Sequence, residues 1–330
     1  MKNIAVIGAG SMGTAVSILL AGNGHIVRMW SPFKEEVDMI NTYREQKHKL
    51  PGAKIPETVT CTVNLQETLE GSDLIILVVP SHTVRQSARN ISKYISGSQI
   101  IACFSKGIEE DTFLRMSEVI SQEIRGARVV AMSGPCHAEE LAFGIPSAYV
   151  AASLDMEAAE LVQDVLMSKT FRVYTNPDVV GVELGGAIKN VIALCAGISD
   201  GLGFGDNTKA ALMTRGIREM ARIGEAMGAQ RETFAGLSGI GDLIVTCTSM
   251  HSRNRRAGIL IGKGKSMEEA VSEVKMVVEG ITTAKAAYKL AKKLNISAPI
   301  IEQAYRVLFE GKDPRQAVNE LMMRDKKCEM

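Results

Sequence analysis

The sequence predicts an α/β fold in which a doubly wound parallel sheet is followed by a mostly α-helical second half. Short apolar segments of strand type alternate with helical segments through the first half of the 330 residues. A glycine-rich turn separates the first strand from the first helix. After about Val173, strand-like segments nearly vanish and long stretches show the period of helices.

The predicted strands are short and apolar, and they are Asn3–Ile7, Ile26–Trp30, Leu74–Val79, Ile100–Phe104 and Arg128–Met132. Gly24 ends the helix between the first two strands. Pro32 and Pro80 then interrupt the pattern after the second and third strands. Because the strands alternate with helices, they are expected to pair in parallel.

The second half is predicted to be a separate helical domain. Its strongest helical segments are Val191–Ala196, Ala210–Met227, Thr283–Leu294 and Ile300–Phe309. A chain of 330 residues is long for one hydrophobic core, so two domains are expected. The boundary is placed near Gly185, which gives a nucleotide-binding domain over residues 1–185 and a catalytic domain over 186–330.

Composition excludes several classes of partner. With 38 basic and 37 acidic side chains, the net charge of +1 gives no overall attraction to nucleic acid or membranes. The six cysteines and five histidines are scattered without metal-site spacing, which predicts no metal and favours a reducing cytoplasm. Residues 3–24 are uncharged, but glycines and hydroxyl side chains interrupt them, so no signal peptide or membrane span is expected.

The segment Gly8-Ala9-Gly10-Ser11-Met12-Gly13 is a G-x-G-x-x-G motif that follows a strand and opens a helix. In that context Gly8 allows the tight turn, Gly10 lets the backbone approach a pyrophosphate, and Gly13 lets helix and strand pack closely. The backbone N–H groups and the dipole of the helix then attract the phosphates. The motif therefore predicts a dinucleotide on a Rossmann domain.

Cofactor choice depends on the end of the second strand. An acidic side chain there would bind a ribose 2′-hydroxyl, and a basic one would accept a 2′-phosphate. The segment Trp30-Ser31-Pro32-Phe33 carries neither, and the first charged candidate is Lys34. Either NADH or NADPH is therefore expected to serve, with NADPH slightly favoured.

Two lysines could supply the proton that reduction of a ketone requires. Lys106 follows a strand at the ligand-binding edge of the sheet. Lys189 lies among small and apolar residues at the start of the helical domain, where burial would lower its pKa. A solvated helix lysine is an equally open interpretation of Lys189.

The basic segment Ser252-Arg253-Asn254-Arg255-Arg256 places hydroxyl, amide and guanidinium groups together, as phosphate sites do. A solvated surface or an RNA contact is the alternative. The segment has no interleaved aromatic residues, which weakens the RNA interpretation.

At these residues the chain resembles the bacterial-type NAD(P)-dependent glycerol-3-phosphate dehydrogenases. The resemblance extends from the first strand to about residue 320. It rests on GAGSMGTA (8–15), VVPSH (78–82), SKGIE (105–109), SGPCHAEELAFGIPSA (133–148), FRVYTNPDVVGVELGGAIKNVIALCAGISDGLGFGDN (171–207), GLSGIGDLIVTCTSMHSRNRR (236–256) and VVEGITT (277–283).

The resemblance implies reversible reduction of dihydroxyacetone phosphate to sn-glycerol 3-phosphate for glycerophospholipid synthesis, in a cytoplasmic enzyme that is a homodimer at family level. It implies that Lys189 is the proton donor and acceptor. The implied substrate contacts are Lys106, Gly134, Cys136, Lys189, Asp242, Ser252, Arg253 and Asn254. The implied cofactor contacts are Gly8, Gly10, Ser11, Met12, Gly13, Phe33, Lys106, Ala138, Arg253, Val277 and Glu279.

The chain departs from the family pattern at three sites. Cys136 and His137 stand where the family usually has Ser or Thr and then Phe, so the expected contact at 136 is a thiol, a weaker donor. Phe33 follows Pro32 where a basic residue or histidine is common, and Met12 replaces an aromatic residue. A dehydrogenase of the 3-hydroxyacid and 6-phosphogluconate group, or a nucleotide-sensing protein without turnover, remains the alternative function.

Overall fold

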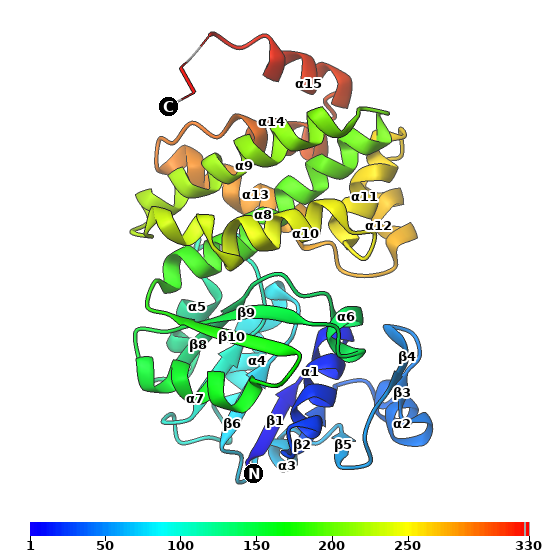
Figure 1. Cartoon of the computed structure of the whole chain (residues 1–330), viewed down its shortest axis with the longest axis vertical. Coiled ribbons are helices and arrows are strands. Elements are labelled where there is room, and N and C mark those ends of the chain that lie inside the picture. The colour runs from blue at the N-terminus through cyan, green and yellow to red at the C-terminus, as the bar shows by residue number, and fades with distance from the viewer. Residues whose placement is uncertain (327, 330) are drawn as a thin grey trace.

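The computed structural model describes residues 1–326 and 328–329, and it has a sheet domain and a helical domain joined by one long helix (Figure 1). The main sheet has eight strands in the order β10-β9-β8-β7-β6-β1-β2-β5. Their bounds are β1 Asn3–Ile7, β2 Ile26–Trp30, β5 Val59–Thr62, β6 Leu74–Leu77, β7 Ile100–Cys103, β8 Arg128–Ser133, β9 Ser147–Ala152 and β10 Phe171–Asn176.

The five predicted strands are confirmed, and the six strands from β5 to β8 pair in parallel in the order of dinucleotide-binding domains. Beyond the predicted strands, β9 adds to the sheet antiparallel to β8, and β10 pairs with β9 in parallel. The alanine-rich sequence of β9, SAYVAA, has little of the β-branched character that marks a strand. Strands β9, β10 and β5 were not among the predicted strands, and for β9 this weak signal is the reason.

Helices cover both faces of this sheet. The alternating side chains of β1 separate into two cores: Ile4 and Val6 face one side, and Ala5 and Ile7 face the other. The bounds of the helices and the small hairpin of this domain are α1 Ser11–Gly22, α2 Lys34–Tyr43, β3 Glu45–Gln46, β4 Leu50–Lys54, α3 Leu65–Leu69, η1 Ser81–Thr83, α4 Val84–Ile91, α5 Met116–Glu123, α6 Ala138–Ala142 and α7 Met156–Leu166.

The helical domain surrounds α8, which starts beside the sheet and runs into the upper half of Figure 1. The predicted helical segments of the second half are confirmed within α8, α9, α13 and α14. The elements of this domain are α8 Val179–Gly201, α9 Asp206–Ala226, η2 Arg231–Ala235, η3 Leu237–Gly241, α10 Asp242–Thr248, α11 Arg253–Gly262, α12 Met267–Val274, α13 Glu279–Lys293, α14 Pro299–Phe309 and α15 Pro314–Met322.

The predicted domain boundary at Gly185 falls inside α8. Val182 packs against strands β8 and β9, whereas Leu184 belongs to the core of the helical domain. Within the described residues α8 alone has the length and composition of a membrane span, with a mean hydropathy of 1.6, yet 78% of its apolar window is buried inside the protein. Its apolar character therefore serves a protein core.

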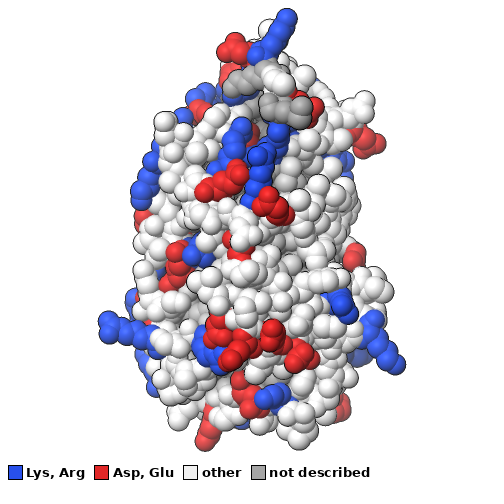
Figure 2. Space-filling model, turned by 60° about the vertical axis from the view of Figure 1, so that its left-hand side comes forward, with Lys and Arg blue, Asp and Glu red and all other residues white. Residues whose placement is uncertain are grey.

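Glycines let α8 and α11 approach at backbone distance. A Cβ at Gly197 would lie 2.1 Å from the carbonyl oxygen of Arg255, and one at Gly258 would lie 2.1 Å from that of Leu194. Because no side chain fits at such distances, glycines are required where α11 packs along the C-terminal part of α8. On the face displayed in Figure 2, acidic and basic side chains are interspersed, as the balanced composition requires.

Candidate active site

The glycine-rich turn has the shape that a pyrophosphate requires. Gly8 has a φ of +118°, and a Cβ there would lie 2.3 Å from the carbonyl oxygen of Val78. A Cβ at Gly13 would lie 1.9 Å from the carbonyl oxygen of Gly8. In contrast, a Cβ at Gly10 would meet no atom within 4 Å, so Gly10 faces open space. Packing therefore requires glycine at positions 8 and 13, whereas Gly10 leaves room for a ligand.

The N-terminus of α1 faces the same space. Its first turn carries no acidic residue, and no side chain caps it, so its N–H groups and dipole are available to an anion. Ser11 donates its hydroxyl to the carbonyl oxygen of Lys49 at 2.6 Å, and Met12 packs partly into the core. Gln46, which no sequence pattern marked, is buried and donates to the carbonyl oxygen of Ala9 at 3.0 Å. The β3–β4 hairpin therefore supports the turn from one side.

The end of β2 combines a shielded carboxylate with an exposed lysine. Glu36 accepts a hydrogen bond from Ser31 at 2.8 Å and forms an ion pair with Lys49. Lys34 extends into solvent and pairs with the exposed carboxylate of Asp38 at 2.6 Å. Phe33, predicted to contact the cofactor, is 60% exposed beside it. A mobile cation and an aromatic ring are thus presented where the adenosine half of a dinucleotide would lie.

A single buried carboxylate joins the two predicted lysines. Asp242, at the start of α10, accepts from Lys106 Nζ through Oδ2 and from Lys189 Nζ through Oδ1, each at 2.6 Å. Lys106 comes from the loop after β7 and also donates to the carbonyl oxygen of Gly134 at 3.2 Å. Lys189 comes from α8, and it is 7% exposed. The structure therefore brings together three residues that lie far apart in the sequence.

The three charged groups shift one another's pKa values. Burial lowers the pKa of Lys189 to about 8, with Lys106 adding to the effect and Asp242 opposing it. Burial also acts against the charged form of Lys106, but Asp242 outweighs it and holds the pKa of Lys106 above its ordinary value. The two lysines hold the pKa of Asp242 low against the opposing effect of burial. Lys189 is thus the group whose proton can leave near neutral pH.

Thr246 orients Lys189. Its hydroxyl donates to the carbonyl oxygen of Asp242 at 2.6 Å and accepts from Lys189 Nζ at 2.7 Å. An ammonium group has three N–H donors, and Asp242 and Thr246 take two of them. The third donor remains for a ligand.

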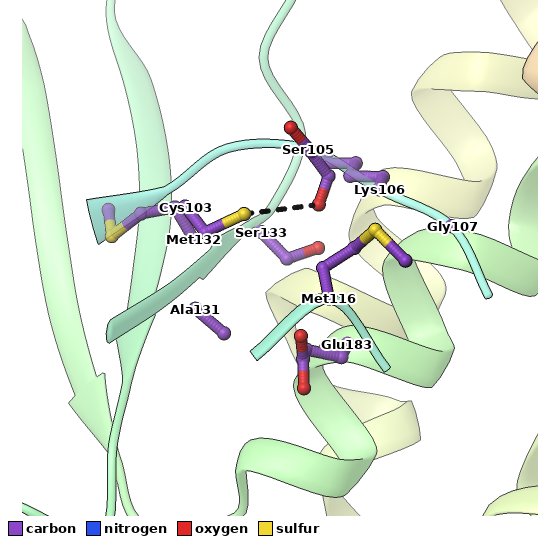
Figure 3. Close-up of a pocket in the computed structure, with 9 residues that line it drawn as sticks. All are labelled: Cys103, Ser105, Lys106, Gly107, Met116, Ala131, Met132, Ser133 and Glu183. Atoms are coloured by element: carbon purple, nitrogen blue, oxygen red, sulfur yellow. Dashed lines mark hydrogen bonds between the residues drawn. The ribbon is translucent and has the colours of Figure 1, made fainter. Parts of the chain in front are cut away.

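Glycines bring α8 close to the sheet. A Cβ at Gly186 would lie 2.4 Å from Ser133 Oγ and 3.4 Å from Lys106 Cδ. Figure 3 shows Lys106, Ser133 and Glu183 around a small cavity beyond the ends of β7 and β8. Glu183 is held there by Arg115 at 2.7 Å. Ser133 and Lys106 can lie against α8 here because α8 carries no side chain at Gly186.

The basic segment forms an anion site at the N-terminus of α11. Ser252 caps the helix by accepting from the backbone N–H of Arg255 at 3.2 Å. Arg253 is partly buried, and within residues 1–326 and 328–329 no carboxylate lies within ion-pair distance of it. The Asn254 side chain, in contrast, is occupied within the protein. Its NH₂ group donates to Asn190 Oδ1 at 2.9 Å, and its oxygen accepts from the backbone N–H of Gly280 at 2.8 Å. Its side chain positions three helices, and one N–H donor remains for a ligand.

The loop that departs from the family pattern lies near the lysines. Gly134 has a φ of +145°, and a Cβ there would lie 3.0 Å from Tyr149 Cα. Burial raises the pKa of the Cys136 thiol to about 12, so it stays protonated. Burial, with Lys189 adding to it, lowers the pKa of His137, whose ring lies 5.6 Å from that of His251. Ala138 follows as the first residue of α6.

The remaining predicted cofactor contacts lie at the start of α13. Glu279 accepts from the backbone N–H of Ser81 at 3.0 Å and from the Ser81 hydroxyl, so it fastens α13 to the end of β6. Val277 is 37% exposed just before it. The contact between Glu279 and Ser81 joins the helical domain to the sheet domain beside the carboxyl end of β6.

Comparison with known proteins identifies the family. The model described as "NAD-dependent glycerol-3-phosphate dehydrogenase N-terminus" matches residues 3–159, and the corresponding C-terminus model matches residues 178–319. This chain belongs to that family. A curated relative from Agathobacter rectalis, named a glycerol-3-phosphate dehydrogenase of NAD(P)+, is 53% identical over 329 residues, which cover 100% of this chain and 98% of the relative.

Other relatives agree. One from Pelotomaculum thermopropionicum with the same name is 56% identical, covering 99% of this chain and 95% of its own. The crystal structure of a glycerol-3-phosphate dehydrogenase from Coxiella burnetii superimposes with a TM-score of 0.95 at 38% identity, covering 98% of this chain and 99% of that one. The predicted fold class and family are confirmed.

Sequence analysis missed several residues that build the site. Thr246 and Asn190 act through contacts 57 and 64 residues away along the chain, and neither belongs to a local motif of its own. Ser81 and Asn190 lie inside segments that carried the family resemblance, which is the only signal that could have drawn attention to them. The predicted absence of a metal stays a prediction.

Substituting Gly10→Val should weaken dinucleotide binding by about 100-fold or more while leaving the thermal unfolding midpoint nearly unchanged. The backbone of Gly10 has φ −75°, which any residue adopts, and the added side chain would fill open space rather than displace protein atoms. The measurement is a fluorescence titration with NADH and with NADPH. Gly22→Ala, which also meets no atom within 4 Å but lies at the far end of α1, is the matched control. Unchanged affinity in Gly10→Val would show that the pyrophosphate does not lie against this turn.

Proposed function

We propose that this chain reduces dihydroxyacetone phosphate reversibly to sn-glycerol 3-phosphate with NADH or NADPH, and that Lys189 is its acid and base. The observation that carries the proposal is the buried arrangement of Lys106, Asp242 and Lys189, which joins the sheet domain to the helical domain. Relatives more than 50% identical over the whole chain are named for this activity.

The turn at Gly8, Gly10 and Gly13 and the uncapped α1 N-terminus fit a dinucleotide, as the open space at Gly10 indicates. The bound cofactor supplies the hydride that reduces the carbonyl carbon. Ser11, Met12, Phe33, Ala138, Val277 and Glu279 complete the proposed cofactor contacts.

The chain's own residues handle the phosphate and the proton. Arg253 and the first N–H groups of α11 bind the phosphate, with Ser252 and Asn254 beside them. Lys189 donates the proton of its third N–H, which has no partner in the protein, to the carbonyl oxygen as the alkoxide develops. It accepts that proton in the reverse direction. Lys106, which stays charged, stabilises the negative oxygen. Gly134 and Cys136 form the opposite wall.

The proposal also includes supply of glycerophospholipid synthesis, a cytoplasmic location and a homodimeric state, which rest on family membership alone. Arg253 at the N-terminus of α11 could bind a carboxylate or a phosphate, so the names of the relatives are what favours dihydroxyacetone phosphate over a 3-hydroxyacid.

Lys189→Ala should lower turnover of dihydroxyacetone phosphate by about 10²- to 10⁴-fold, because general acid catalysis is lost. Dinucleotide affinity should stay nearly intact, since the glycine turn lies in the other domain. The assay is NADPH oxidation followed by absorbance, with and without dihydroxyacetone phosphate. Lys169→Ala, an exposed lysine of the sheet domain, is the control. Turnover like that of the unmodified protein would remove Lys189 from the mechanism, and no turnover in the unmodified protein would favour a binding protein.

The rate of ketone reduction should fall as pH rises through about 8, because the protonated form of Lys189 is the acid and its pKa is lowered to about 8. Oxidation of sn-glycerol 3-phosphate should rise through the same pH. In Thr246→Val the Lys189 ammonium loses a hydrogen-bond acceptor, which lowers its pKa. The pH dependence of reduction and that of oxidation should therefore both move down by about one pH unit. The measurement is kcat/KM against pH in both directions. Limbs that do not move would contradict the role of Thr246.

Lys34→Gln should weaken NADPH binding by about tenfold and leave NADH binding unchanged, because Lys34 is the cation available to a 2′-phosphate at the end of β2. Dissociation constants for both cofactors decide the matter, with Lys169→Gln as the control for a lost surface charge. A hundredfold preference of the unmodified protein for NADH would overturn the expectation that NADPH is slightly favoured.

A further inference from the structure

A second cavity lies in the helical domain and shares no residue with the candidate active site. Its volume is about 580 Å³, and it opens between α8, α9, α14 and α15, in the upper part of Figure 1. Its walls are mainly aliphatic and include Ile198, Leu212, Ile300, Ala304, Val307 and Leu321. Sites for organic ligands have volumes of about 300–1,000 Å³ and mostly apolar walls with a few placed polar groups.

Two polar atoms in these walls lack a hydrogen-bond partner within the described residues. They are the hydroxyl oxygen of Ser199, a residue that is 4% exposed, and Oε1 of Gln303. Buried polar groups are nearly always satisfied, because leaving one unpaired destabilises the fold. Ser199 lies on α8 and Gln303 on α14, on two walls of the same cavity. The two walls therefore carry polar groups that the described residues leave unpaired.

The mouth of the cavity is cationic. Arg215, Arg222 and Arg324 line it, and none of them has an ion-pair partner in residues 1–326 or 328–329. The acidic groups of the lining are Asp325 and the buried Glu219. Burial raises the pKa of Glu219 to about 7, so this carboxyl carries only part of a negative charge at neutral pH. Three cations thus face little opposing charge.

We propose that this cavity binds a single-chain acyl carboxylate, that is, a fatty-acid-like anion. The chain lies against the aliphatic side chains of α8 and α14, and the carboxylate lies on the guanidinium groups at the mouth. The apolar surface is a hollow, which suits a single free chain, whereas a bilayer surface would require protruding apolar side chains.

The test uses the full chain and dodecanoate below its micellar concentration, titrated by isothermal calorimetry. One saturable site is expected, and affinity should rise about fourfold for each methylene added from octanoate to dodecanoate, because each methylene is removed from water. Dodecylamine, with the opposite charge, should bind at least tenfold more weakly. Absence of saturable binding, or equal affinity for the amine, would overturn the proposal.

Two variants locate the site. Ala211 is an exposed residue of α9 on the cavity wall, so Ala211→Trp should fill the mouth without disturbing the core and abolish binding. Arg222→Gln should weaken dodecanoate about tenfold, whereas Arg125→Gln, an exposed arginine of the sheet domain, should have no effect. Binding that survives Ala211→Trp would place the ligand elsewhere. A dimer that Ala211→Trp dissociates, with no dodecanoate bound to the unmodified protein, would assign the cavity to a second copy of the chain and overturn the proposal.

Discussion

The carboxylate of Asp242 is the constraint on which the rest of the site depends. It is buried, and it holds one lysine from the sheet domain and one from the helical domain at 2.6 Å each. Two cations this close together in a dry interior would repel strongly without it, and breaking such a pair typically destabilises a protein by about 3–5 kcal/mol. The geometry of the two lysines therefore rests on one carboxylate.

That arrangement leaves the site with an excess of one positive charge, which suits an anionic ligand and a developing alkoxide. It also gives the two lysines different pKa values. Asp242 keeps Lys106 charged, whereas the apolar surroundings of Lys189 bring its pKa to about 8. Two residues of the same type thus take different roles through their environments alone. Thr246 adds a directional acceptor, so that only one N–H of Lys189 faces the ligand space.

The parts that sequence predicted are those whose physical cause is local. The strand, the glycine turn and the helix of residues 3–22 follow from backbone sterics within one short segment. The apolar neighbours of Lys189 left burial and solvation equally open, and the structure shows it buried. Gln46 and Thr246 could not be found in this way, because their partners come together only through packing of distant segments. Asn254 shows the converse. It was predicted as a ligand contact, and its amide is largely occupied in joining α8, α11 and α13.

The apolar composition of α8 has a chemical purpose as well as a structural one. A helix that is apolar on every side must be buried on every side, and glycines at 186 and 197 allow the sheet and α11 to close on it at backbone distance. The lysine at 189 is consequently desolvated by its own helix as much as by its neighbours. Polar side chains around α8 would admit water, raise the pKa of Lys189 toward its ordinary value and remove its ability to exchange a proton near neutral pH. The hydropathy that resembles a membrane span therefore accounts, in this fold, for the lowered pKa that the proposed acid and base role of Lys189 requires.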